Sequence, residues 1–247
     1  MELDPKVFEE ATTTLWSFPD RGNWATHEGT YRGNWSPYVP RNLILKYTHP
    51  GDRVLDCFVG GGTTAIECKL LGRRCMGLDI NEAAITEAQG KVNFKMPAQD
   101  YEIFEPVLKV GDARDLSVVP NDYVDLLCAH PPYANAIRYT KLDADLSRLE
   151  VKAFLQEMAT VACESYRVVK PGVICAVLIG DLRKNKRVVP LGFWLVDVYL
   201  SAGFVLKEIA IKAQHNCQAT DAWREKAQKL GFLLLAHEYL FIFEKPK

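Results

Sequence analysis

The amino-acid sequence predicts an α/β protein with a doubly wound, mostly parallel sheet. Apolar runs suited to buried strands alternate with segments whose apolar residues recur at helical spacing. The first predicted strand runs directly into three glycines and then into a helix. Such a turn forms a ligand-binding edge, because glycine lets the backbone approach a ligand closely and the start of the helix offers free amides.

The first half of the chain contains four predicted strands separated by helices, with the turn 50–52 before the first strand. The predicted strands are 53–58, 73–79, 107–111 and 123–129, and the predicted helices are 40–46, 65–71 and 81–92.

The second half continues the alternation. The predicted helices are 150–168 and 191–202, and the predicted strands are 172–180, 204–211 and 232–243. A polar stretch, 213–229, separates the last two strands, so we expect them to pair antiparallel at one edge of the sheet.

Length and charge limit the organisation of the molecule. The 247 residues, 48% of them hydrophobic, suffice for one large core. We therefore expect a single domain over residues 1–247, in which residues 1–50, rich in aromatic residues, glycine and proline, form an irregular cover segment. This segment either packs as a cover only or also lines the pocket. The net charge of −1 gives no general attraction to nucleic acid, so such contacts would need local basic patches.

Cysteine usage and hydropathy predict a cytoplasmic protein. There is no signal-peptide pattern, and no apolar run approaches the ~20 residues of a membrane span. Six of the seven cysteines lie in or beside apolar stretches and are expected to be buried reduced thiols: Cys57, Cys68, Cys75, Cys128, Cys163 and Cys175. The triplet 215–217 lacks partners at ligand spacing, so we predict no metal site.

Asp79 ends the second predicted strand, about 20 residues beyond the glycines, where an acidic side chain binds ribose hydroxyls in nucleoside-binding sheets. Its alternative role is to cap the helix that begins near Asn81, although Asn81 could do this itself. Residues 60–65 also satisfy the loose G-x-G-x-x-A pattern of nicotinamide-binding proteins, so a dehydrogenase remains an alternative at this point.

The fourth predicted strand ends in His130-Pro131-Pro132-Tyr133, where two prolines stiffen a loop at the carboxyl edge of the sheet. Residues 56–64, which read DCFVGGGTT, resemble the D-x-F-x-G-x-G-T-T cofactor motif of the amino-methyltransferases that modify adenine N6 or cytosine N4 in DNA. The tetrapeptide is similar to their catalytic motif, usually Asp, Asn or Ser followed by Pro-Pro and an aromatic residue. Residues 34–36 and 237–243 also resemble parts of this family, so the resemblance covers most of the chain.

This resemblance implies a Rossmann-like class I methyltransferase fold with S-adenosylmethionine as cofactor. Asp79 would bind the ribose and Asp112 the adenine amino group, although Asp115 competes with Asp112, which could also be a turn residue. Gly60 and Gly62 would leave room beside the methionine portion. The implied cofactor-binding residues are Asn34, Trp35, Ser36, Asp56, Phe58, Gly60, Gly62, Thr63, Thr64, Asp79, Ile80, Asp112 and Ala113.

The resemblance also implies direct in-line methyl transfer to a flipped base, with His130, Pro131, Pro132 and Tyr133 as catalytic residues. The first side chain and the Pro131 carbonyl would accept the amino hydrogens while Tyr133 stacks on the base. His130 departs from the usual pattern, since imidazole accepts only when neutral. Activity should then fall below about pH 6. Alternatively, His130 only caps the loop and the Pro131 carbonyl acts alone.

DNA is the expected partner, and RNA is not excluded. The expected nucleic-acid contacts are Arg138, Lys141, Arg183, Lys184, Lys186 and Arg187, although a charged run is also typical of a solvated loop. No separate recognition domain is visible, so a homodimer would add contact area. The remaining alternatives are an RNA-base methyltransferase, a protein-glutamine methyltransferase and a non-catalytic cofactor-binding module.

Overall fold

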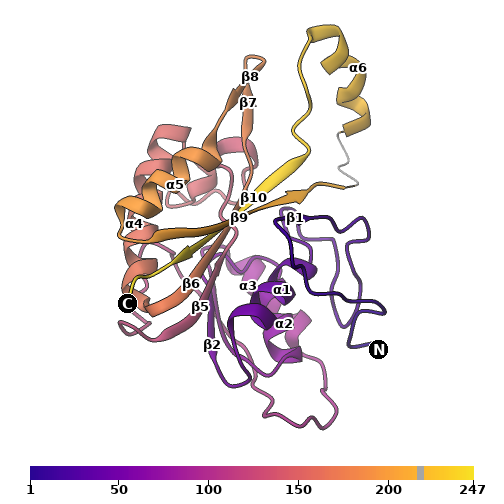
Figure 1. The fold of residues 1–247 in the computed structure, drawn as a ribbon, viewed down its shortest axis with the longest axis vertical. Helices are drawn as coiled ribbons and strands as arrows, with labels where there is room; N and C mark the ends of the chain where they lie inside the picture. Colours follow the sequence, from indigo (N-terminus) through magenta and orange to yellow (C-terminus); the bar gives the residue numbers. More distant parts are fainter. Residues whose placement is uncertain (216–219) are drawn as a thin grey trace.

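The computed structural model describes residues 1–215 and 220–247, which form one large sheet covered by helices and a small hairpin (Figure 1). The strands are β1 (Leu15–Trp16), β2 (Arg53–Asp56), β3 (Arg74–Asp79), β4 (Val107–Val110), β5 (Val124–Ala129), β6 (Val169–Ile179), β7 (Leu182–Lys184), β8 (Arg187–Val189), β9 (Val205–Ala213) and β10 (His237–Glu244). The helices are α1 (Tyr38–Tyr47), α2 (Thr63–Leu70), α3 (Glu82–Val92), α4 (Val151–Val168), α5 (Leu191–Ser201) and α6 (Thr220–Leu230), with 3-10 turns η1 (Ala134–Ala136) and η2 (Leu146–Arg148).

The central sheet has the order β1–β9–β10–β6–β5–β2–β3–β4. Strands β6, β5, β2, β3 and β4 are parallel to one another. Strand β1 is parallel to β9, and β10 is antiparallel to both β6 and β9. The predicted α/β fold with a mostly parallel sheet is therefore confirmed, as is the antiparallel pairing of the last two long strands.

The antiparallel strand β10 does not lie at the edge, because β9 and β1 lie beyond it. Burial explains this difference from the predicted arrangement. Residues 240–243 of β10 are all buried, so both faces of this strand need cover, whereas only Ala210 is buried in β9. The apolar strand takes the inner position and the more exposed strand takes the outer one.

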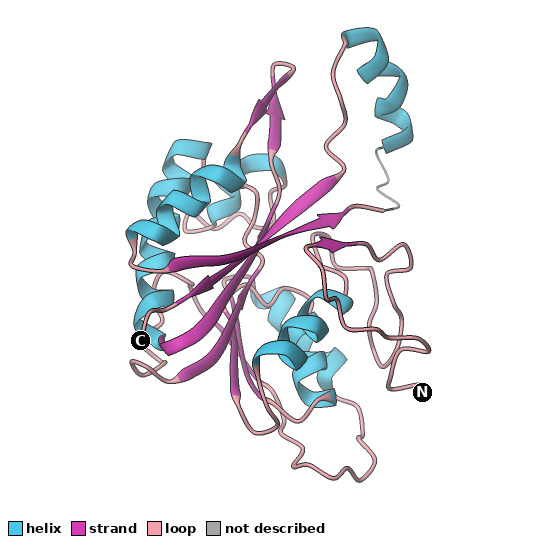
Figure 2. Cartoon of the chain, viewed as in Figure 1, coloured by secondary structure: helices cyan, strands magenta, loops and turns pink. Residues whose placement is uncertain are grey.

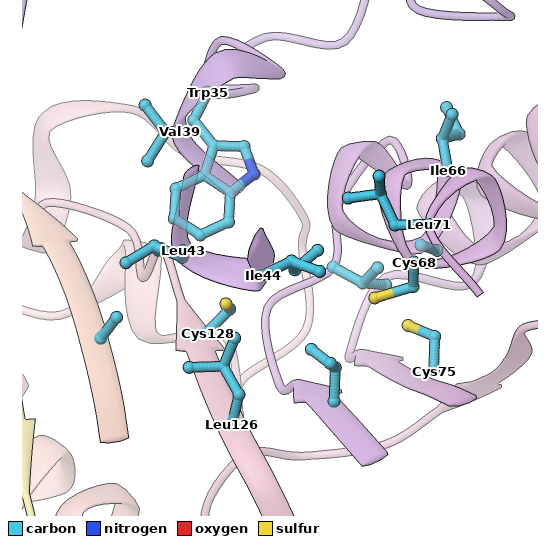
Figure 3. Packing of buried hydrophobic residues seen from close by; sticks show 14 of the residues in the cluster. Trp35, Val39, Leu43, Ile44, Ile66, Cys68, Leu71, Cys75, Leu126 and Cys128 are labelled. Atoms are coloured by element: carbon cyan, nitrogen blue, oxygen red, sulfur yellow. The ribbon is translucent and has the colours of Figure 1, made fainter. Parts of the chain in front are cut away.

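Helices α1 to α3 and helices α4 and α5 form a layer on each face of the sheet, while α6 stands apart (Figure 2). Alternation along β5 separates the two cores, since Leu126 and Cys128 pack with α1 to α3, while Leu127 and Ala129 pack with α4 and α5. Figure 3 shows the first core, in which Ile44 of α1 lies between Cys128 of β5 and Cys68 of α2. The result is the two-faced cover expected of a doubly wound sheet.

Three segments differ from the sequence predictions. The polar stretch contains helix α6, whose mostly polar sequence did not predict a helix, and the last strand begins at His237 rather than at residue 232. The basic cluster after β6 forms the hairpin β7–β8, with Asn185 and Lys186 at positive φ in its two-residue turn.

Five of the six named cysteines are buried free thiols, but the prediction that Cys163 is buried is wrong. It faces solvent on α4, whose neighbouring Val161 and Ala162 face the core. Of the triplet 215–217, Asn216 and Cys217 lie outside the described residues.

The N-terminal segment is attached to α2 by a buried ionic cluster. Glu67 is fully buried and accepts hydrogen bonds from Trp24 Nε1 (2.8 Å), His27 Nε2 (2.7 Å) and Arg41 Nη1 (2.9 Å). Since all three donors precede β2 in the chain, this one carboxylate fixes the cover segment over the first core. None of the helices among the described residues is long and apolar enough to cross a membrane.

Candidate active site

A cavity of about 560 Å³ opens at the carboxyl ends of the central parallel strands. This is where ligands bind in open α/β sheets, and its volume is within the usual range for small-molecule sites. Thirteen of the predicted site residues line it: Asn34, Trp35, Ser36, Phe58, Gly60, Asp79, Ile80, Asp112, Ala113, His130, Pro131, Pro132 and Tyr133. The structure thus brings the glycine turn and the H-P-P-Y loop together around one space.

Four predicted cofactor residues, Asp56, Gly62, Thr63 and Thr64, do not line this cavity but support its wall. Asp56 is buried and accepts hydrogen bonds from Thr64 Oγ1 (2.5 Å) and Phe58 N (3.0 Å), which joins the end of β2 to the start of α2. Burial raises the pKa of Asp56 to about 7. The geometry therefore gives Asp56 and Thr64 an internal role in shaping the turn.

The glycines leave room for Tyr31 of the cover segment. A Cβ atom at Gly60 or Gly61 would lie 2.9 or 2.8 Å from Tyr31 side-chain atoms. The cover segment is also held by Thr63 Oγ1, which donates to Asn34 Oδ1 at 2.6 Å. Because Tyr31 and Asn34 both border the cavity, the segment 1–50 contributes to the site as well as covering the core.

Asp79 is oriented by backbone amides and borders the cavity. Its carboxylate accepts from Gly60 N (3.0 Å) and Asn81 N (2.9 Å). The cap of α3 is Asn81, whose side chain accepts from Ala83 N, so the alternative capping role belongs to Asn81. Burial raises the pKa of Asp79. Each carboxylate oxygen keeps a second lone pair, which is available to a hydroxyl group in the cavity.

Asp112, rather than Asp115, borders the cavity. Arg114 forms a salt bridge with Asp112 (2.5 Å between Arg114 Nη2 and Asp112 Oδ2) and also with Glu157 (2.6 Å). Asp115 instead accepts from Ser117 N in the following turn. Arg114 therefore orients the Asp112 carboxylate, while Asp115 serves the local loop.

The H-P-P-Y loop places two rings at the other end of the cavity. His130 stacks on Trp35, with ring centroids 5.6 Å apart and an interplanar angle of 20°. Its Nε2 atom lies 3.0 Å from Tyr133 Oη, which donates to Glu238 Oε1 at 2.6 Å. A Cβ atom at Gly180 would lie 2.9 Å from the Tyr133 ring, so glycine at the end of β6 makes room for this arrangement.

Burial lowers the pKa of His130 to about 4, against the opposing effect of Glu238. The imidazole is therefore neutral and able to accept a hydrogen bond well below neutral pH. The sequence-based expectation of a loss of activity below about pH 6 is corrected accordingly, because it used the pKa of an exposed histidine.

Sequence reasoning missed several residues that line the cavity and belong to neither motif: Arg21, Tyr31, Tyr139, Asp145, Lys212 and Glu238. The signal for Glu238 was its charge at the start of a strand that is otherwise apolar. Lys212 stands directly opposite Glu238 in the register of β9 and β10, and their side chains are 2.7 Å apart. Only the strand order brings this pair to the site.

The predicted nucleic-acid residues lie outside the cavity. Arg183 is engaged within the protein, since it donates to Leu233 O and lies 4.7 Å from the centroid of the Phe232 ring. Lys184 forms an exposed ion pair with Glu150. The exposed cations are Arg138 and Lys141, on the loop after β5, and Lys186 and Arg187, on the hairpin β7–β8, which projects beyond the sheet in Figure 1. No cluster of three metal-ligating side chains occurs within residues 1–215 and 220–247 as described.

Comparison with known proteins connects this site to a family. Residues 4–90 match the family model described as DNA methylase. The type II methyltransferase M.SmaI of Serratia marcescens is 30% identical over 89 residues, which are 36% of this chain and 29% of that protein. A tRNA (guanine(10)-N2)-dimethyltransferase of Methanothermobacter thermautotrophicus is 34% identical over 104 residues, which are 42% of this chain and 29% of that protein. These alignments span less than a third of either relative.

A structural relative supports the fold. A SAM-dependent methyltransferase from Methanosarcina mazei aligns with a TM-score of 0.59 at 16% identity and covers 83% of this chain and 97% of that one. The matched residues 4–90 include the cover segment, the glycine motif and Asp79. The match of residues 4–90 and the type II methyltransferase relatives thus make this part of the chain similar to the amino-methyltransferases that modify adenine N6 or cytosine N4, and they support S-adenosylmethionine as the cofactor.

Proposed function

We propose that this protein is an S-adenosylmethionine-dependent methyltransferase that methylates the exocyclic amino group of adenine or cytosine in DNA. The observation that carries the proposal is that the glycine turn and the H-P-P-Y loop border the same cavity of about 560 Å³. A cofactor held at the turn and a base held at the loop would meet inside it, so the methyl group could pass directly to nitrogen as its bond to sulfur breaks, which would leave S-adenosylhomocysteine and release one amino proton to water.

The residues at the first end of the cavity fit the cofactor. The Asp79 carboxyl group would accept hydrogen bonds from the ribose hydroxyls. Phe58 and Ile80 would provide apolar walls for the adenine ring. Asp112 would accept from the adenine amino group, beside the Ala113 amide. When bound, the cofactor supplies an electrophilic methyl group. We propose that Asn34 and its neighbours Trp35 and Ser36 complete this end.

The residues at the other end fit a flat base with an amino group. The amino nitrogen is a weak nucleophile because its lone pair is delocalised into the ring. We propose that neutral His130 and the Pro131 carbonyl accept hydrogen bonds from its two N–H groups, while Tyr133 packs against the base and Pro132 stiffens the loop. A base in a duplex would have to leave the stack to enter the cavity.

The decisive experiment expresses the chain in a host that lacks DNA methylation and sequences the methylated bases. We expect one sequence motif to carry N6-methyladenine or N4-methylcytosine with the wild type and none with His130→Ala. Calorimetry with S-adenosylhomocysteine provides the control, since the variant should bind this product as tightly as the wild type. An unmodified genome with the wild type would reject the proposal.

An RNA base is the second candidate substrate. It is favoured by the similarity to the tRNA (guanine(10)-N2)-dimethyltransferase, which covers 42% of this chain, and the same acceptors would serve any planar conjugated amine. Transfer of a tritiated methyl group to purified DNA, RNA and protein would separate these substrates. Label in RNA alone would identify RNA as the substrate, and label in protein alone would favour a glutamine amide as the methylated group.

We propose that Lys186 and Arg187 of the hairpin, with Arg138 and Lys141 of the loop after β5, contact the nucleic-acid backbone. All four are exposed, so their charges are available to phosphates. Because the proposed substrate is cellular DNA, we also propose the cytoplasm as the location. A homodimer stays a prediction, as does the single domain over residues 1–247.

A further inference from the structure

A relay of four hydrogen-bonded polar side chains connects strands β9 and β10 to the H-P-P-Y loop. Its members are Lys212, Glu238, Tyr133 and His130. Lys212 Nζ of β9 donates to Glu238 Oε2 of β10 at 2.7 Å. The other carboxylate oxygen of Glu238 accepts from Tyr133 Oη at 2.6 Å, and Tyr133 Oη lies 3.0 Å from His130 Nε2. Lys212 and Glu238 are almost enclosed, with side-chain exposures of 14% and 10%.

The proton positions along this relay follow from what each group can do. An ammonium group only donates and a carboxylate only accepts. Tyr133 uses its one hydroxyl hydrogen to donate a hydrogen bond to Glu238. Toward His130, the Tyr133 oxygen can therefore only accept a hydrogen bond. The Nε2 atom must then carry a hydrogen, and a neutral imidazole with its hydrogen on Nε2 has its lone pair on Nδ1.

Glu238 is held in the acceptor form that this argument requires. Burial alone would raise the pKa of Glu238, but the Lys212 ammonium and the hydrogen bonds from Lys212 and Tyr133 lower it below its usual value. The positive charges of Lys212 and Arg21 also disfavour a second proton on His130. A single neutral form of the imidazole is therefore expected.

The Nδ1 atom is the free acceptor of this ring. It makes no hydrogen bond within the described part of the chain, and the ring borders the cavity while stacked on Trp35. We propose that Lys212 and Glu238 are positioning residues that act through Tyr133 to hold His130 in its Nε2–H tautomer, so that Nδ1 accepts a hydrogen bond from the substrate amino group. This inference rests on the proposed function for its substrate, but the tautomer itself does not.

The relay explains how a histidine can stand where the family usually has Asp, Asn or Ser. Those side chains always present an oxygen acceptor, whereas an unconstrained imidazole would spend part of its time with hydrogen on Nδ1. Fixing the hydrogen on Nε2 turns the ring into a constant acceptor. The pair that fixes it lies on strands near the end of the chain, far from the tetrapeptide in sequence.

The test is nitrogen-15 NMR of the whole protein without cofactor or substrate, with the His130 signals assigned by comparison with His130→Asn. In the wild type we expect Nε2 to be protonated and Nδ1 to be unprotonated. In Glu238→Gln, Lys212 should hold the amide oxygen and turn the amide NH₂ toward Tyr133. Tyr133 would then donate to His130 Nε2, and the hydrogen should move to Nδ1.

Activity gives the second measurement. Glu238→Gln should lower kcat for amino methylation by about 10²-fold, the usual scale of one lost hydrogen bond to the reacting group, while the Kd for S-adenosylhomocysteine stays within about twofold. The matched control is Glu244→Gln, the same change on the same strand, where Glu244 pairs with Lys207 away from the site. This control should change neither the tautomer nor kcat.

Two results would overturn the inference: a wild-type His130 with hydrogen on Nδ1, or an unchanged tautomer in Glu238→Gln. If Glu238→Gln does not fold, Tyr133→Phe replaces it and should give a mixture of tautomers, because the ring then loses its partner. An unchanged Nε2–H tautomer in Tyr133→Phe would also overturn the relay. A wild-type protein with the Nε2–H form that methylates no nucleic acid would support the relay and reject the proposed function.

Discussion

At the scale of single residues, Asp56 is a buried carboxyl group whose partners are a hydroxyl and a backbone amide. Its folded-state pKa of about 7 lies above the unfolded value near 4. The folded protein thus keeps the proton to higher pH, so the free energy of unfolding decreases as pH rises from about 4 to about 7.

Asp56→Asn should remove this pH dependence while keeping an acceptor for Phe58 N. Measured by urea unfolding, the stability of the variant relative to wild type should increase by roughly 3 kcal/mol between pH 5 and pH 8. The exposed Asp100 provides the control, and Asp100→Asn should show no such trend. Parallel stability curves for Asp56→Asn and wild type would contradict the buried, protonated carboxyl.

The pKa shift of His130 is opposite in sign to that of Asp56. Its folded pKa of about 4 lies below the unfolded value near 6.5, so the unfolded chain takes up the proton first and stability is lost as pH falls between these values. Methyl transfer should be constant from about pH 8 to pH 5 and should decrease near pH 4. The groups facing the ring are Glu238, Lys212, Arg21 and Tyr133.

An NMR titration of the His130 ring, combined with rates measured after brief pH jumps, checks this prediction. His130→Asn should keep activity but lose the acidic limb, since an amide acceptor does not titrate. An inflection near pH 6 in the wild type would show that the ring is more exposed than described.

At the scale of elements, the attachment of the cover segment to α2 depends on one carboxylate. Glu67→Gln should lower the free energy of unfolding by about 3 kcal/mol, because Arg41 loses a buried counter-charge. Affinity for S-adenosylhomocysteine should fall as well, since the same segment carries Asn34. Chemical denaturation and calorimetry measure the two effects.

Glu87→Gln on α3 is the control for the cover segment. Glu87 pairs with Lys91 one turn further along the same helix, and its side chain is 36% exposed. Loss of such a pair should cost under about 0.5 kcal/mol and leave cofactor affinity unchanged. Equal effects of the two substitutions would show that the buried cluster has no special role.

The hairpin β7–β8 should act in nucleic-acid binding and not in cofactor binding. Replacing Lys186 and Arg187 by alanine should weaken DNA binding and reduce the salt dependence of log K by about 2, because two phosphate contacts are lost. Fluorescence anisotropy over a range of salt concentrations measures this change, and affinity for S-adenosylhomocysteine should stay constant.

The charge-matched control for the hairpin replaces Lys95 and Lys109 by alanine. Lys95 follows α3 and Lys109 lies on the edge strand β4, and both are exposed. If this control lowers DNA affinity as much as the hairpin variant does, the effect comes from net charge, and the hairpin has no specific contact.

At the scale of the whole molecule, both cores share one sheet, so the chain should unfold as a single cooperative unit. Far- and near-ultraviolet circular dichroism should give one coincident melting curve. S-adenosylhomocysteine at 100 times its Kd should add about 2.7 kcal/mol to the free energy of unfolding. Separate melting of residues 1–50 would contradict a single domain.

The sequence predicts most of the fold because its signals are local. Apolar strands and the glycine turn lie where expected, and Asp79 and His130 meet in one cavity because parallel strands end at the same edge. Lys212 and Glu238 could not be predicted, because their place depends on which strand enters the gap beside β6. Helix α6 was missed because its sequence is mostly polar, so that the short apolar row of Trp223, Ala227 and Leu230 does not stand out.

The inner position of β10 also has a consequence for synthesis. Strands β6 and β9 pair with β10 and not with each other, so β9 and β1 cannot join the remaining strands until residues 237–244 have left the ribosome. Local strand pairs can form earlier, but these long-range ladders close last. A nascent chain therefore holds its glycine turn and H-P-P-Y loop before it holds Glu238, and the site becomes complete only at the final step of folding.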